Sequence, residues 1–289
     1  MNVVMLMGSL SALGADAPTF DEVLAEAPDE AWEAVPPEDL LVMRVGDHDV
    51  VIELAPRFAP ANVANIHTLV SGGFFDGLAI VRAQDNYVVQ WADPDAETAQ
   101  ARSLGAAAAK VPVELDRPSR DVEMTRLASR DAYAKRVGFV DGLPVGSEGG
   151  RVWLAHCYGM VGVARDAARD SGNGSSLYVV TGHAPRHLDR NITLVGRVID
   201  QLEVLSALPR GSGRLGFYEG DDALVPITSV RRVSDLPEGE RPAWRRIRTD
   251  HPTFEALVES RRHRHEAWFL DPVGRIGLCN VPLPRERVR

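Results

Sequence analysis

The chain has 289 residues with a formal net charge of −9, and it is 45% hydrophobic and 25% charged. This length and composition are typical of a globular protein with a substantial hydrophobic core in one or two domains. The negative charge argues against a general nucleic-acid binder, since such proteins need a basic surface.

The first feature in chain order is an apolar stretch from residue 3 to residue 15. Residues 1–17 are therefore a candidate secretory signal, although no Lys or Arg precedes the apolar stretch and Pro18 follows it closely. The alternative is a chain start that is not a signal. The stretch is too short to span a bilayer, and no later segment qualifies. We expect a periplasmic or secreted protein, with a cytoplasmic location as the alternative.

Residues 18–38 are predicted to form a helical N-terminal extension. Thr19 and Glu22 have the spacing of a capping box, in which two side chains satisfy free backbone N–H groups at a helix start. Pro36 and Pro37 end this extension, because the residue before a proline is disfavoured in a helix.

The next residues predict a hairpin followed by a helix. Residues 40–45 and 50–54 are apolar strand candidates, and the Gly and Asp residues between them are typical of a tight turn. Pro60 suits the first turn of a helix. Apolar residues then recur at helical spacing up to residue 70, and the glycines at 72 and 73 end the helix.

Two short apolar runs follow, at residues 78–81 and 87–91, and two polar side chains stand at distinctive positions beside them. Arg82 ends the first run, and Gln90 lies in the second. Because strand side chains alternate between the two faces of a sheet, Gln90 shares a face with Val88. A cation, an amide and apolar surface can then line one pocket, whose chemistry needs neither a nucleophile nor a metal ligand.

Further short strands are predicted up to residue 235, around a less regular middle. Residues 94–156 are the least regular part, with two possible strands at 111–115 and 122–127 and a loop-like stretch at 146–150. Strand patterns resume at residues 160–164, 177–180, 192–198 and 227–233, and a helical period covers 198–208. About eight strands and two helices with Gly- and Pro-rich turns favour a closed barrel or sandwich over a parallel α/β sheet.

Residues 236–289 have a different character and form a predicted C-terminal extension with one helix. The helix is expected at residues 253–269, with apolar residues such as Phe254 and Trp268 on one face. Arginines and histidines at residues 261–265 make its polar part.

Two other patterns carry little functional information. Cys157 and Cys279 are too few for a disulfide framework and lack metal-site spacing, so one disulfide in an oxidising compartment and two separate thiols both fit. Residues 211–216 match a glycine-rich dinucleotide pattern, but they follow a helical segment and not the strand that such a site requires.

Several segments resemble, in the same order along the chain, the cyclophilin family of peptidyl-prolyl cis-trans isomerases, and most closely its bacterial members. These segments are Phe-Phe-Asp-Gly at 74–77 followed by Arg82, Tyr-Val-Val-Gln at 87–90, Gly-Met-Val-Gly-Val-Ala-Arg at 159–165, Ser-Ser-Leu-Tyr-Val-Val at 175–180, and Thr-Leu-Val-Gly-Arg-Val at 193–198. Each match alone is weak, but their ordered spacing is specific. Together they cover residues 39–235, with additional length around 116–157.

The resemblance implies a mainly β fold: a closed eight-stranded antiparallel barrel capped by two helices, here with helical extensions at both ends. It implies an enzyme that accelerates rotation about X–Pro bonds in proline-containing polypeptides and assists protein folding, without a metal or another cofactor. A cyclophilin-like module that binds peptides or proteins with little turnover is the alternative. The oligomeric state is not predicted.

The resemblance also implies the residues of the site. Arg82 and Gln90 are the expected catalytic residues. The expected substrate-binding residues are Tyr87, Val88, Ala164, Arg165, Ser176, Tyr178 and Leu188. The chain departs from the family pattern at several of these positions: Ser176 stands where a second amide is usual, and Tyr178 replaces the usual Phe. Ile192 and His187 replace the usual rim residues, and these departures favour the binding-module alternative.

Overall fold

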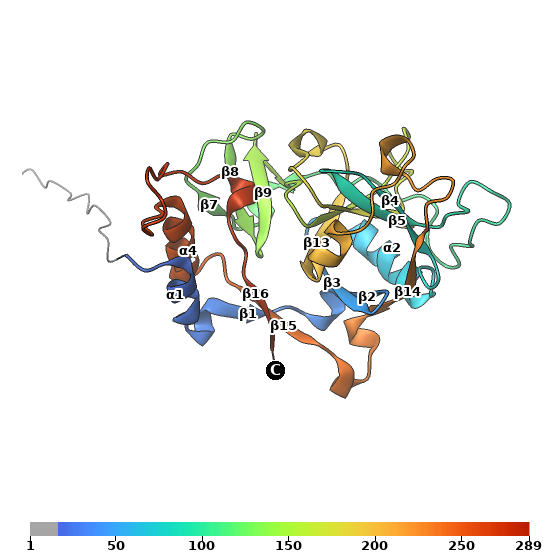
Figure 1. Cartoon of the computed structure of the whole chain (residues 1–289), viewed down its shortest axis with the longest axis horizontal. Coiled ribbons are helices and arrows are strands. Elements are labelled where there is room, and N and C mark those ends of the chain that lie inside the picture. The colour runs from blue at the N-terminus through green and yellow to red at the C-terminus, as the bar shows by residue number, and fades with distance from the viewer. Residues whose placement is uncertain (1–16, 289) are drawn as a thin grey trace, which may run out of the picture.

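Residues 17–288 are described by a computed structural model, in which eight antiparallel strands close into a barrel (Figure 1). All of the candidate signal segment except residue 17 lies outside these residues. The order around the barrel is β11–β12–β5–β4–β14–β2–β3–β13. The bounds are β2 (Leu40–Val45), β3 (His48–Leu54), β4 (Ala79–Ala83), β5 (Val88–Ala92), β11 (Met160–Val163), β12 (Leu177–Val180), β13 (Leu194–Asp200) and β14 (Val225–Arg232). The predicted closed barrel is confirmed.

Alternation of apolar residues along the strands fills the barrel. Along β2, Leu41, Met43 and Val45 are buried in the core, whereas Arg44 between them is partly exposed. This period of two is the one that places every second side chain inside a closed sheet. Burial of each such side chain contributes about 1.5–3 kcal/mol to stability.

Two helices cover the barrel, as expected. In α2 (Pro60–Ser71), Pro60 occupies the first turn, and the apolar residues at helical spacing are buried against the barrel. Glu114 accepts hydrogen bonds from the first backbone N–H groups of this helix, those of Ala61 and Asn62, at 3.0 and 2.9 Å. The second helix, α3 (Leu202–Ser206), is shorter than its predicted period because residues up to Asp200 extend β13.

The extra length before Cys157 forms a second sheet, which the sequence did not predict. Its strand order is β6–β10–β9–β8–β7. The strands are β6 (Arg117–Pro118), β7 (Thr125–Leu127), β8 (Arg136–Val140), β9 (Leu143–Glu148) and β10 (Arg151–Leu154). The strand prediction at residues 111–115 was wrong. This segment has no regular structure and contacts the first turn of α2, where Glu114 accepts the hydrogen bonds described above. Figure 1 shows β7, β8 and β9 beside the barrel.

The loop prediction for residues 146–150 was wrong for its first three residues, which belong to β9. Gly146 lies under the ring of Trp153 on the neighbouring strand, and a Cβ atom on it would meet that ring at 2.8 Å. Its glycine therefore serves close packing within a sheet and not a turn. The turn itself is made by Gly149 and Gly150, which both have positive φ.

The two extensions come together although they are far apart in sequence. Strand β1 (Trp32–Ala34) pairs with β15 (Ala243–Ile247), which pairs with β16 (Arg285–Val288). Helix α1 (Phe20–Ala25) has the predicted capping box and packs against α4 (Pro252–Arg262). The prediction of helical extensions was incomplete, because the extensions also contain strands. Strands β1 and β15 pair although they are more than 200 residues apart. The predicted helix at 253–269 ends at Arg262, and Trp268, which was expected on its apolar face, is 81% exposed.

An apolar cluster, a buried ion pair and a disulfide attach the extensions to the rest of the molecule. In the cluster, Phe254 of α4 packs edge-on against Phe139 of β8, with ring centres 5.1 Å apart. The carboxylate of Glu53, buried on β3, accepts hydrogen bonds from Arg285 of β16 (2.8 Å) and from Arg246 of β15. Burial raises the pKa of Glu53, but the two arginines outweigh it and hold the pKa below its ordinary value. Cys157 and Cys279 form a disulfide that connects the entrance of β11 to the C-terminal extension.

No helix within residues 17–288 has the length and the apolar character that crossing a bilayer requires.

Candidate active site

The nine residues expected at the site line one open groove of about 1000 Å³ on the barrel. Strands β4, β5 and β12 supply its floor, and loops around residues 164–176, 186–192 and 211–224 form its walls. The nine are Arg82, Gln90, Tyr87, Val88, Ala164, Arg165, Ser176, Tyr178 and Leu188. The barrel thus brings together residues that are up to 106 positions apart, the separation of Arg82 and Leu188.

Arg82 and Gln90 face each other across neighbouring strands. They are register partners on β4 and β5, next to an irregularity between Ile80 and Arg82. The Nη1 atom of Arg82 donates to Oε1 of Gln90 at 3.3 Å, and Nε2 of Gln90 donates to Oγ of Ser176 at 3.0 Å. Each end of the Gln90 amide therefore has one partner, which fixes its orientation. Ser176, in the position of the usual second amide, holds Gln90 in place.

The remaining donors of Arg82 point to groups that the sequence did not indicate. Its Nε atom donates to the backbone carbonyl of Leu215 at 2.7 Å, and Nη2 donates to the side-chain oxygen of Gln84. Its guanidinium carbon lies 5.3 Å from the ring centre of Phe217 and 5.7 Å from that of Tyr87. Arg82 forms no ion pair within residues 17–288. Burial lowers its pKa from the ordinary value, but an arginine remains charged at neutral pH.

The loop that holds Arg82 is the glycine-rich segment at residues 211–216. Leu215 has a φ of +59° and Gly216 a φ of +78°, both in the left-handed region. A Cβ atom on Gly216 would meet the Cα atom of Gln84 at 2.6 Å and the carbonyl oxygen of Ala83 at 2.8 Å. The glycine is required so that this loop can approach the end of β4 closely. Sequence reasoning identified the pattern but not its role, because nothing in it indicates a partner 130 residues away.

An apolar hollow lies beside the guanidinium. Tyr178 and Val88 are buried there, and Tyr87, Ala164 and Ile192 pack partly buried around them. The ring of Tyr178 lies directly over Gly162 of the neighbouring strand, where a Cβ atom would collide with the ring at 2.3 Å.

The hydroxyl of Tyr178 begins a buried polar chain. It lies 2.9 Å from Nε2 of His156, whose Nδ1 lies 3.0 Å from Oδ1 of Asp189. Oδ2 of Asp189 accepts a 2.6 Å hydrogen bond from Nε of Arg186, and Arg186 also pairs with Asp131 at 2.9 Å. Sequence reasoning missed this chain because its members come from four separate segments and form no motif.

The electrostatics of this chain favour fixed protonation states. Burial raises the pKa of Asp189, but hydrogen bonds from His156 and the charge of Arg186 outweigh it and lower that pKa below its usual value. Burial raises the pKa of the Tyr178 hydroxyl, so Tyr178 stays neutral. The hydroxyl of Tyr178 therefore has a buried hydrogen-bond partner in His156, which a Phe at this position would not require.

The rim of the groove combines stacked rings and free backbone groups. The imidazole of His187 stacks on the ring of Tyr87, with centres 6.4 Å apart and planes 5° apart. The side chain of Arg165 donates to the carbonyl of Asn191 at 2.9 Å, so it shapes the wall and does not extend into solvent. The N–H of Ala164 donates to Ser176 at 3.0 Å, whereas its carbonyl has no partner among the hydrogen bonds of residues 17–288.

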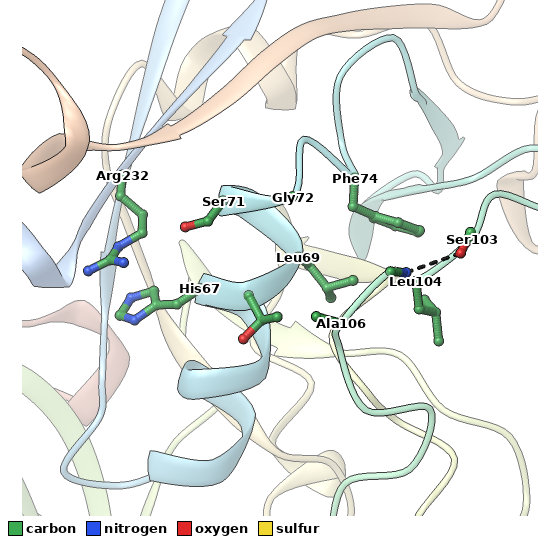
Figure 2. A pocket seen from close by; sticks show the side chains of 11 residues that line it. His67, Leu69, Ser71, Gly72, Phe74, Ser103, Leu104, Ala106 and Arg232 are labelled. Carbon is green, nitrogen blue, oxygen red and sulfur yellow. Dashed lines mark hydrogen bonds between the residues drawn. The ribbon is translucent and has the colours of Figure 1, made fainter.

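A separate pocket of about 450 Å³ lies at the C-terminal end of α2 (Figure 2). Figure 2 shows His67 and Arg232 next to each other on one side of the helix and Leu104 and Ala106 on the other. Burial and the charge of Arg232 lower the pKa of His67, which therefore favours its neutral form. None of the expected site residues lines this pocket.

Comparison with known proteins identifies the family. The model of the cyclophilin type peptidyl-prolyl cis-trans isomerase family matches residues 40–231. A probable peptidyl-prolyl cis-trans isomerase of Brucella suis is 24% identical over 203 residues, which cover 68% of this chain and 84% of that protein. A probable peptidyl-prolyl cis-trans isomerase of Brucella abortus is 23% identical with the same coverage. A crystal structure of a cyclophilin from Hirschia baltica is similar, with a TM-score of 0.69, 26% identity, and coverage of 93% of this chain and 97% of that chain.

Proposed function

The chain belongs to the cyclophilin-type peptidyl-prolyl cis-trans isomerase family, and we propose that its isomerase reaction takes place in the groove between Arg82 and Tyr178. The observation that carries this proposal is the pairing of Arg82 with Gln90 beside an apolar hollow. Proline-containing polypeptides are the substrates, as is general for this family.

The reaction requires no covalent chemistry. The X–Pro amide resists rotation because its C–N bond has partial double-bond character, with a barrier of about 18–20 kcal/mol. When the bond is twisted, conjugation is lost and the prolyl nitrogen can accept a hydrogen bond. A catalyst that donates to the twisted form stabilises it relative to both planar forms, and this lowers the barrier.

Arg82 is the donor in this proposal. Its guanidinium is held by Leu215, Gln84 and Gln90, so its position is set before the substrate arrives. Its charge is not neutralised by a carboxylate within residues 17–288, which leaves its field available to the substrate. Gln90 keeps the guanidinium in place and lies beside the expected path of the peptide backbone.

The apolar hollow receives the pyrrolidine ring of proline. Tyr87, Val88 and Tyr178 supply its apolar surface, and Leu188 closes one side. The unpartnered carbonyl of Ala164 can accept a hydrogen bond from an extended peptide that adds itself along the barrel edge. Positioning and a fixed positive charge, and not proton transfer, carry the reaction.

A proline-isomerisation assay on a series of X–Pro tetrapeptides tests this proposal. We expect Arg82→Ala to lower kcat/KM by about 100-fold or more, since it removes the preorganised donor. Arg136→Ala is the matched control, because Arg136 lies on β8 away from the groove, is exposed, and its side chain has no ion pair or hydrogen bond within residues 17–288. Equal rates for wild type and Arg82→Ala would reject catalysis at this groove.

A peptide-binding module with little turnover is the second candidate. Ser176 and Tyr178 replace residues usual in the family, and three groups of this chain already occupy three of the five N–H donors of Arg82. Titration of the same tetrapeptides would separate the two: saturable binding that needs Arg82 but no acceleration of exchange supports the module.

We also propose that the protein works in an oxidising compartment outside the cytoplasm, the periplasm or the exterior. The disulfide between Cys157 and Cys279 supports this location, because such bonds are rare in reducing compartments. The apolar stretch at residues 3–15 supplies a candidate signal for export. Mass spectrometry of the exported protein tests both points: an intact Met1 or two free thiols would argue against the proposal.

A further inference from the structure

The loop after α4 exposes three large apolar side chains within six residues. The side chains of Trp268, Leu270 and Val273, here called the apolar tip, are 81%, 97% and 79% exposed. Single exposed apolar residues are ordinary on protein surfaces, but a cluster of this kind usually marks a contact site. The tip does not line the groove, and it does not belong to a strand or loop that lines the groove.

The tip is held by local contacts. The N–H of Phe269 donates to the carbonyl of Glu266 at 2.9 Å, which forms a turn. The ring of Phe269 packs edge-on against that of Trp268, with centres 4.9 Å apart, and the guanidinium of Arg264 lies over the Phe269 ring, 4.9 Å from its centre. Phe269 is thereby covered, while its neighbours Trp268 and Leu270 are left outside.

A cationic pocket of about 540 Å³ adjoins the tip. It is lined by Arg130, Arg262 and Arg275 together with the glycines at 274 and 277, and no carboxylate lines it among residues 17–288. Arg130 and Arg275 have no ion pair within that part of the chain. Arg262 pairs with Glu259 at 3.1 Å, but its Nε atom is buried without a hydrogen-bond partner.

We propose that the apolar tip and the cationic pocket together dock this end of the molecule on a membrane surface that contains anionic phospholipid. Trp and Leu side chains favour the boundary between head groups and acyl chains, and arginines favour the phosphates above it. Gly274, which lines the pocket, directly follows Val273 of the tip, so one contact can engage both. Glu266 and Asp271 lie in the same loop, and their negative charges weaken the attraction of the arginines to anionic lipid. The cationic pocket alone is therefore not sufficient, and the apolar tip is also required.

Other partners fit these observations less well. Three side chains that project from a loop offer far less area than the roughly 800 Å² per partner of a stable protein interface. A net charge of −9 opposes nucleic acid at the rest of the surface. A membrane is deformable, and projecting side chains can insert into it without a complementary shape.

The apolar tip lies at the end of the molecule that is farther from the groove (Figure 1). Helix α4 packs on α1, with the guanidinium of Arg261 4.3 Å from the ring centre of Phe20, so the described chain starts at this end. Figure 1 shows α1 and α4 at one end of the molecule and β4 and β5 toward the other, so docking leaves the groove free. The proposal does not depend on isomerase activity.

Co-sedimentation of the full chain with vesicles tests the proposal. We expect binding to vesicles of mixed phosphatidylcholine and phosphatidylglycerol, weaker binding to phosphatidylcholine alone, and loss of binding at high salt. The double variant Trp268→Ser/Leu270→Ser should lower the bound fraction at least tenfold, and Arg130→Gln/Arg275→Gln should remove the preference for phosphatidylglycerol. Val288→Ser and Arg169→Gln are matched controls, because both residues are exposed elsewhere on the surface.

Two further readings make the outcome decisive. Trp268 emission should shift to the blue on adding mixed vesicles, and Trp268→Phe should remove this shift. Urea unfolding of each variant shows that it is folded. Absence of vesicle binding, or equal binding by the tip variants, overturns the proposal. So does binding of inorganic phosphate at the pocket without vesicle binding, or a vesicle-free dimer that the tip variants dissociate.

Discussion

The Nε atom of Arg82 donates a 2.7 Å hydrogen bond to the backbone carbonyl of Leu215, a residue whose φ is +59°. A backbone acceptor cannot rotate away as a side chain can, so this bond fixes the direction of the guanidinium. The left-handed conformation of Leu215 costs about 1–3 kcal/mol and persists because the surrounding loop imposes it. The loop at residues 211–217 is therefore a positioning element for the expected catalytic arginine.

We expect Gly216→Ala to lower kcat by about 10- to 100-fold and to raise KM by a smaller factor. Its Cβ atom would meet the backbone of Gln84 at 2.6 Å and displace the carbonyl of Leu215 from Arg82. Steady-state isomerisation kinetics measure the change. Gly46→Ala is the control, since Gly46 lies in the turn between β2 and β3, away from the groove, and has a positive φ with nothing within 4 Å of an added Cβ atom. In an Arg82→Ala background, Gly216→Ala should have no further effect on the isomerisation rate. If it lowered the rate there by the same factor as in the wild type, the loop would not act through Arg82.

Tyr178→Phe should destabilise the fold by about 1–3 kcal/mol, because it leaves Nε2 of the fully buried His156 without a partner. The apolar hollow keeps its shape, so isomerase activity should change only a few-fold. Urea unfolding measures the stability. Tyr133→Phe provides the comparison, since the hydroxyl of this exposed tyrosine forms no hydrogen bond within residues 17–288. Equal stability of the two variants would show that the hydrogen bond between Tyr178 and His156 contributes nothing to stability.

Asp39→Asn should stabilise the protein at pH 8 and have little effect at pH 4. Burial, followed by repulsion from Glu38 and Glu53, raises the pKa of Asp39 to about 6 in the folded state. A carboxyl whose folded pKa lies above its unfolded value binds its proton more tightly when folded, so stability falls as the pH rises from about 4 to 6. Asp39 is half exposed, so after screening by solvent we expect a gain of about 1 kcal/mol above pH 6.

Thermal or urea unfolding across that pH range measures this effect. Asp47→Asn is the control, because the side chain of Asp47 is fully exposed. Glu53 has the opposite sign: its folded pKa is lowered, so its contribution is present above about pH 4.5 and is lost as the pH falls below that value. A stabilisation by Asp39→Asn that is the same at pH 4 and pH 8 would contradict the assignment.

Reduction of the disulfide should lower stability by about 2–4 kcal/mol, since the bond joins residues 122 positions apart. Unfolding in the presence and absence of dithiothreitol measures the loss. The variant Cys157→Ser/Cys279→Ser should match the reduced wild type and should no longer respond to reductant. A double variant as stable as the oxidised wild type would show that the disulfide adds nothing to the apolar contacts and the Glu53 ion pairs that hold the extension.

The parts of the fold that could be predicted are local. The hairpin of β2 and β3, the helix α2 and the pairing of Arg82 with Gln90 depend on residues close in sequence, with short turns between them. Their periodicity and turn residues contain most of the information required. The resemblance to a known family added the order of the remaining barrel strands and the identity of the groove residues.

The insertion sheet and the paired extensions could not be predicted in this way. Gly146 was interpreted as a loop residue because glycines are common in loops. A glycine is required there because the ring of Trp153 on the next strand leaves no room for a Cβ atom, and this contact is not visible in the sequence. Strand β1 has only three residues and becomes a strand because β15 offers it partners more than 200 residues later. Short segments of this kind carry no periodicity that a sequence window can detect.

The sequence by itself determined the barrel, its two covering helices and the presence of an arginine and an amide on adjacent strands. Only the tertiary structure decided what holds them: Leu215 behind Arg82, His156 behind Tyr178, and the bond between Cys157 and Cys279. The physical reason is that strand and helix patterns arise from interactions between near neighbours along the chain. The contacts that orient a side chain at the groove join segments that approach each other only after the barrel has closed.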